Sequence, residues 1–145
     1  MPVKTFRGLI ASGDTDTITL HTNNGAIGYR IVKFRMMTVL PGTTDYEHIM
    51  KIWKVPGEAA DEEIDFSNQR LLSAGFSEGA AATNFQGNEE SVIFDNEIFN
   101  QDIYITQFDS KSGLPCNYYL ELEQIKLDLT QNTVATLKDI RNTQA

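Results

Sequence analysis

The side chains of this sequence with the most versatile chemistry are two histidines and one cysteine. His21 and His48 each fall in a segment with the alternation of a β-strand, and the cysteine is Cys116. Nucleophilic catalysis would need a thiol beside a histidine that a third group orients, and the order of residues indicates no such group. The His-Glu-x-x-His helix and the Cys/His spacings of zinc sites are also absent. We therefore expect no catalytic residue, and we interpret Cys116 as a small core residue in a reducing compartment.

Paired carboxylates are a second source of chemistry. Glu121 and Glu123 project from one face of a strand about 7 Å apart, a separation that two glycosidase carboxylates could have. Leu120 and Leu122 occupy the other face. The simpler interpretation is the solvated side of an amphipathic strand.

Acidic residues near turns could offer oxygen ligands to calcium. They are Asp14, Asp16, Asp95, Glu97 and Asp102. The Asp-x-Asp-x-Asp-Gly loop that makes such a site specific is absent, and turn-forming and capping roles account for these residues. No glycine-rich segment opens a helix, so no phosphate loop is indicated. We expect no metal and no cofactor.

Aromatic side chains suggest binding instead of catalysis. They are Trp53, Phe85, Tyr104, Tyr118 and Tyr119. A β-sandwich can present such rings as a platform for sugars, and exposed tyrosine or tryptophan also anchors protein interfaces. Burial in the core is the simpler interpretation for each ring taken singly.

The sequence predicts seven or eight short strands, separated by turn signals, as the elements that position these residues. They lie near residues 17–21, 27–40, 48–55, 64–66, 92–94, 102–108 and 117–128, with 69–76 either strand or helical turn. No alternation of strands and helices suggests a Rossmann or TIM architecture. We expect a mainly-β protein, an antiparallel β-sandwich or jelly roll, in a single domain of residues 1–145.

The strand pattern also predicts which side chains share a face of a strand, where a bulge lies and where a loop lies. Val32, Phe34 and Met36 should face one way, and Lys33 and Arg35 the other. The apolar phase slips at Gln124, where a one-residue bulge would explain it. Small and polar side chains over 77–90 predict a loop that could reach a neighbour.

Two elements suggest contact with a partner. Trp53 lies in the predicted strand at 48–55, which is apolar on both faces and fits a central strand covered on two sides or one that meets a partner. At the C-terminal end, Thr130 would cap a short helix with a stripe of Val134, Leu137 and Ile140. So short a helix is marginal alone and must dock on its own sheet or on another subunit.

Composition limits the function further. The 145 residues carry a net charge of −8, which opposes binding to nucleic acid through a broad basic face. The basic run Arg30, Lys33 and Arg35 is a local exception, most simply the solvated face of a strand. No segment approaches the about 20 apolar residues of a membrane span, and the start has no signal peptide pattern.

Three stretches resemble known proteins: VIFDNEIFNQDIYIT at 92–106, CNYYLELEQIKLDL at 116–129 and the closing TVATLKDIRN. Together they are similar to small virion structural proteins of marine bacteriophages. The resemblance implies a coat-associated or other particle subunit and supplies no functional residues.

We therefore expect a non-enzymatic virion structural protein, a capsid-associated subunit (coat, cement or decoration) made in the host cytoplasm and located in the virion. Its partners would be itself, as a homo-oligomer or lattice, and other virion proteins, with no nucleic acid and no membrane. The alternative is a carbohydrate- or receptor-binding β-module of a phage tail or fibre. The predicted interface residues are Trp53, Phe85, Val134, Leu137 and Ile140.

Overall fold

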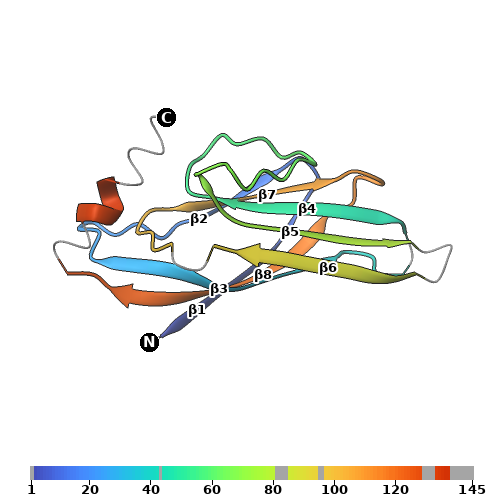
Figure 1. The fold of residues 1–145 in the computed structure, drawn as a ribbon. Helices are drawn as coiled ribbons and strands as arrows, with labels where there is room; N and C mark the ends of the chain where they lie inside the picture. Colours follow the sequence, from blue (N-terminus) through green and yellow to red (C-terminus); the bar gives the residue numbers. More distant parts are fainter. Residues whose placement is uncertain (1, 43, 81–84, 95–96, 129–132, 138–145) are drawn as a thin grey trace.

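The computed structural model describes residues 2–42, 44–80, 85–94, 97–128 and 133–137, with the backbone alone at 85–87. Within these residues the chain forms eight strands and a short helix at 133–137 (Figure 1). The strands are β1 (Val3–Ile10), β2 (Thr15–Ile18), β3 (Ile27–Thr38), β4 (Tyr46–Trp53), β5 (Leu71–Ala80), β6 (Phe85–Ile93), β7 (Ile103–Asp109) and β8 (Cys116–Lys126).

The strands form two antiparallel sheets that pack face to face. The first sheet has the order β1-β8-β3 and the second the order β2-β7-β4-β5-β6. β1 pairs with β8, β2 with β7 and β4 with β5, so these pairs nest along the chain as they do when one long hairpin is wrapped into a jelly roll. The predicted mainly-β antiparallel sandwich is confirmed.

The remaining nested pair would join β3 to β6, but β6 pairs with β5 instead. Its side chains still reach β3. Glu89 accepts a hydrogen bond from the backbone N–H of Met36 at 2.7 Å, and the Ser91 hydroxyl donates to the Phe34 carbonyl at 3.0 Å. β6 therefore lies at the margin of the sandwich between the two sheets, as Figure 1 shows.

The core lies between the sheets and follows the alternation of the strands. In β8, Tyr118, Leu120 and Leu122 are buried, and the residues between them point outward. The buried side chains that meet them from the second sheet include Met50, Ile52, Ile103 and Ile105.

A β-bulge lies in β3, not in β8 as the apolar pattern predicted. The pairing shifts between Ile31 and Lys33, whereas β8 pairs without a shift through Gln124. Val32 is the extra residue and is 38% exposed, whereas Phe34 is buried, so the prediction that the two side chains face the same way was wrong. The slip in β8 needs no bulge because the strand ends soon afterwards, at Lys126.

Residues 77–90, predicted to be a loop, belong largely to two paired strands. β5 continues to Ala80, and β6 begins at Phe85. The small residues serve close packing: a Cβ on Gly79 would come within 2.7 Å of the Tyr46 ring. The loop prediction was wrong for 77–80 and 85–90, while residues 81–84 lie outside the described residues. At Gly79, the small residue that suggested a loop is required by a neighbouring aromatic ring.

The segment between β4 and β5 folds over the outer face of β4 (Figure 1). Lys51 is 3% exposed, and its ammonium group donates to the Asp61 carboxylate and the Glu63 carbonyl, both at 2.6 Å. The hydrogen bond from Lys51 lowers the pKa of Asp61. β4 is thus a central strand covered on both faces by the chain itself. Residues 64–66, predicted to be a strand, lie in this segment and contain none.

The short helix is attached to the sandwich by a small face. Ala135 is 6% exposed, and the Thr136 hydroxyl accepts a hydrogen bond from the amide of Asn100 at 2.9 Å. The predicted cap, Thr130, lies outside the described residues. In the described part of the chain, no helix has the length and apolar character needed to cross a membrane.

Candidate interaction surface

The outer face of the β1-β8-β3 sheet carries apolar side chains in water. The register places its outward residues in rows across the three strands. Two of these rows are Leu9–Asn117–Met37 and Arg7–Tyr119–Arg35. Leu9 is 52% exposed, Met37 65% and Tyr119 36%. These three residues, called the apolar patch below, leave nonpolar surface in solvent, which is typical of a binding surface when the side chains adjoin one another.

Polar side chains around the apolar patch are held in place. The Arg35 guanidinium donates to Glu89 at 2.6 Å, and the Tyr119 hydroxyl donates to Glu121 at 2.8 Å. The bond to Glu121 raises the pKa of Tyr119, which therefore stays neutral at physiological pH. A shallow pocket of about 230 Å³ lies here, with Asn117 in its wall.

The two carboxylates with glycosidase spacing lie on this same face. Glu121 accepts from Tyr119, and Glu123 accepts from Arg30 at 2.6 Å. Each is engaged by a neighbouring side chain on the outer surface of a sheet. This placement supports the interpretation as the polar side of an amphipathic strand.

The five predicted interface residues fall in different environments. Trp53 is 5% exposed and packs in a small core cluster, so it is not available to a partner. The prediction that Trp53 contacts a partner was wrong because the segment that covers β4 comes from the same chain. Val134 and Leu137 are 55% and 59% exposed on the helix. The side chain of Phe85 and all of Ile140 lie outside the described residues.

The aromatic residues considered as a possible sugar platform do not gather on one surface, where their side chains are described. Tyr118 is buried, and its hydroxyl donates to Asp16 at 2.9 Å; burial and this bond raise the pKa of Tyr118. Tyr104 is half-buried against Trp53. Among the platform residues whose side chains are described, Tyr119 is the exposed one.

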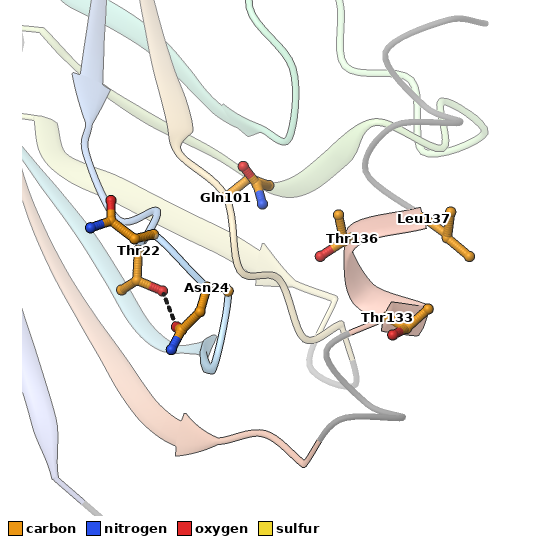
Figure 2. Close-up of a pocket in the computed structure, with 8 residues that line it drawn as sticks. Thr22, Asn24, Gln101, Thr133, Thr136 and Leu137 are labelled. Atoms are coloured by element: carbon orange, nitrogen blue, oxygen red, sulfur yellow. Dashed lines mark hydrogen bonds between the residues drawn. The ribbon is translucent and has the colours of Figure 1, made fainter.

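A polar pocket of about 390 Å³ lies between the turn at 22–25, the start of β7 and the helix (Figure 2). Figure 2 shows Gln101 on one wall and Thr133 and Thr136 on the helix side. The described lining residues are Thr22, Asn23, Asn24, Gly25, Gln101, Thr133, Thr136 and Leu137. These residues offer hydroxyl and amide groups that could hydrogen-bond a small polar molecule, and none of them is an acid, a base or a usual metal ligand.

Asp102 anchors the chain close to this pocket. Its Oδ1 accepts from the His21 ring at 2.7 Å and from the backbone N–H groups of Leu20 and His21 at 2.8 and 3.0 Å. Burial opposes ionisation, but these bonds together lower the pKa of Asp102. The carboxylate therefore ties the end of β2 to the start of β7, as the capping interpretation requires.

The other candidate calcium ligands are separated. Asp16 accepts from Tyr118, and Glu97 pairs with Lys54 at 3.1 Å. Asp95 lies outside the described residues. Across the described ranges, no three His, Cys, Asp or Glu side chains form a group that could hold a metal ion.

A serine, a histidine and an aspartate stand side by side across the second sheet. His48 in β4 is opposite Ser77 of β5 on one side and Asp109 of β7 on the other, and all three are buried. Ser77 is the centre of Gly75-Phe76-Ser77-Glu78-Gly79, which has the Gly-x-Ser-x-Gly spacing of hydrolase nucleophiles. In those enzymes the serine sits on a sharp strand-to-helix turn, whereas here the motif runs through the regular strand β5.

The hydrogen bonds of His48 argue against a catalytic relay in this row. Its Nε2 lies 2.8 Å from the Thr38 hydroxyl, and its Nδ1 lies 3.1 Å from Gln107 Oε1. The Gln107 amide nitrogen donates to two backbone carbonyls, so its oxygen faces the ring and Nδ1 carries the proton. Among the described residues, neither ring nitrogen bonds to Ser77 or Asp109. Burial lowers the pKa of His48, against the opposing effects of Gln107 and Asp109.

Cys116 is the remaining residue with reactive potential. Its side chain is fully buried, and burial raises the pKa of the thiol to about 12. Since the thiolate is the nucleophile, this cysteine is inert at neutral pH. Its interpretation as a small core residue is confirmed.

The sequence matches no protein-family model and no curated protein. The buried polar groups His48, Asp109 and Lys51 are engaged within the fold. The apolar patch and the exposed helix residues are left in solvent, and they are the candidate functional features.

Proposed function

We propose that this chain is a non-enzymatic structural protein of a virus particle, a capsid-associated subunit that acts through protein–protein contacts. The observation that carries the assembly role is the apolar patch of Leu9, Met37 and Tyr119. Removing apolar surface from water stabilises a complex by about 25 cal/mol per Å² before the cost of association. The resemblance of 92–106 and 116–129 to virion proteins of marine bacteriophages supports the particle as its location.

The helix gives a second, separate support for assembly. Val134 and Leu137 point into solvent, while Ala135 faces the sandwich. A short helix gains most of its stability from packing an apolar face, and the more apolar side of this one is exposed. A neighbouring copy or another virion protein would complete it.

To test the assembly role, the mass of the purified chain is measured at rising concentration and again in the presence of particles. The variant Leu9→Asp/Met37→Asp should weaken self-association or particle binding at least tenfold. Ile64→Asp is a matched control, because Ile64 is 39% exposed outside the apolar patch. A wild-type chain that stays monomeric and does not join particles would refute the proposal.

The glycan-binding alternative keeps one supporting observation. Tyr119 stands beside Asn117 at the shallow pocket of the outer face, so one ring and one amide could contact a sugar. A glycan array of the wild type, repeated with Tyr119→Ala, tests this role. An array without hits would remove it.

A further inference from the structure

β1 has an unpaired edge. It is the terminal strand of the β1-β8-β3 order, and among the described residues no strand pairs with its other side. We propose that β1 pairs antiparallel with β1 of a second copy of this chain, about a two-fold axis at Phe6, so that two three-stranded sheets become one continuous sheet. The inference rests on the proposed function and names the partner and the contact through which assembly begins.

The backbone determines which groups the edge offers. The N–H of Gln124 donates to the Pro2 carbonyl at 2.8 Å, so Pro2 belongs to the set of β1 residues that bond to β8. Because bonding alternates along an antiparallel strand, the N–H and C=O groups of the odd-numbered residues point away from β8. These residues are Val3, Thr5, Arg7 and Leu9. Such a row of donors and acceptors fits another extended strand.

The side chains of β1 match those of a second β1 when Phe6 lies opposite its own copy. On the outer face, Val3 then faces Leu9, and Thr5 faces Arg7. On the inner face, the two Phe6 rings meet, each half-buried and packed against the core of its own copy. Apolar residues face apolar residues, and the cations of the two strands do not face each other.

Other registers fit less well. A pairing centred on Arg7 places two guanidinium groups directly opposite, which is destabilising. A pairing centred on Thr5 shortens the ladder to residues 3–7 and leaves Leu9 unmatched. The register at Phe6 keeps the outward groups from Val3 to Leu9 paired, which favours a second copy as the occupant of this edge.

Cysteine crosslinking tests the register directly. Two Phe6→Cys copies would have Cα atoms about 4.5 Å apart, within the range of a disulfide. Oxidised glutathione should then convert most of the assembled variant into a covalent dimer. Leu9→Cys is the control, because two copies of residue 9 would lie about 20 Å apart in this register. The native Cys116 is fully buried and does not interfere.

A backbone variant separates this contact from assembly in general. Thr5→Pro removes one outward N–H, at an edge position where proline is tolerated, and Thr5→Ala keeps that N–H. Mass photometry should show at least a tenfold loss of dimer for Thr5→Pro and none for Thr5→Ala. Assembly that survives Thr5→Pro, with no crosslink through Phe6→Cys, overturns the β1 pairing and leaves the proposed function standing. A wild-type chain that is monomeric and ignores particles overturns both.

Discussion

Asp109 is the side chain whose loss should most clearly destabilise the fold. Its Oδ1 accepts from the N–H groups of Glu47 and Lys111, both at 3.0 Å, and its Oδ2 accepts from Leu114 N–H at 2.8 Å. Burial opposes ionisation of Asp109, but these bonds lower its pKa overall. The carboxylate thus joins β4 to the turn that connects β7 and β8.

A fourth, longer bond reaches Oδ1 from the Ser112 N–H at 3.5 Å, so Asp109→Ala leaves four N–H groups without this acceptor. An unpaired buried donor costs about 1–3 kcal/mol. Lys111 and Ser112 are exposed, and water can replace their bonds, so the two part-buried donors, Glu47 and Leu114, dominate. We expect a loss of about 3 kcal/mol in the free energy of unfolding, which corresponds to a Tm lower by about 6–12 °C.

The assay is urea unfolding at pH 7, followed by the fluorescence of Trp53, the single tryptophan. Asp109→Asn keeps one oxygen but turns an N–H toward the Leu114 N–H. Its free energy of unfolding should therefore fall by about half as much as that of Asp109→Ala. Asp14→Ala, an exposed acid, should change stability by no more than about 0.5 kcal/mol. A loss below about 1 kcal/mol for Asp109→Ala would show that the carboxylate does not organise the turn.

Three further changes test other parts of the fold. Burial lowers the folded-state pKa of His48 below 6.5, so the unfolded chain takes up a proton first as the pH falls below 6.5. Wild-type stability should therefore fall with acidity by up to about 1.4 kcal/mol per pH unit, and urea titrations from pH 7.5 to 5 should show a shallower slope for His48→Gln. Gly79→Ala forces a Cβ to within 2.7 Å of an aromatic ring and should cost about 1–3 kcal/mol in urea unfolding. Lys51→Met should release the segment 54–70 and speed its cleavage in limited proteolysis, whereas Lys33→Met, on the outer face, should not.

The alternation of apolar residues predicts the sandwich because each face of a strand meets a different environment. The prediction fails where the type or the exposure of a residue is determined by a neighbour that is distant in the sequence. Gly79 is small because of Tyr46, and Val32 is exposed because β3 carries the extra residue of a bulge. Neither requirement is visible in the segment that contains the residue. Most strand positions were therefore predictable, whereas β1, the bulge in β3 and the pairing of β5 with β6 were not, and the strand predicted at 64–66 does not form.

The candidate surface was partly predictable in the same sense. Tyr119 and Leu137 could be singled out by type and spacing, but Leu9 and Met37 become one patch with Tyr119 only when β1 and β3 flank β8. The buried Ser77–His48 row had a sequence signal in its Gly-x-Ser-x-Gly spacing. That signal does not reveal that Thr38 and Gln107 occupy both ring nitrogens.

Charge explains why association should use the β1-β8-β3 side of the molecule. Copies with a net charge of −8 repel one another, so a contact is least opposed where the acid excess is absent. The outer face carries the cations Arg7, Arg30, Lys33 and Arg35 against the carboxylates Glu121 and Glu123. A β1–β1 contact at this margin depends on backbone bonds and apolar side chains, while the remaining acidic surface supplies the repulsion.

Salt screens that repulsion more than it weakens the contact, so dimerisation should strengthen between about 0.01 and 0.15 M salt. If it weakened instead, the contact would depend on ion pairs between the basic face of one copy and the acidic surface of another, and the β1 pairing would be wrong.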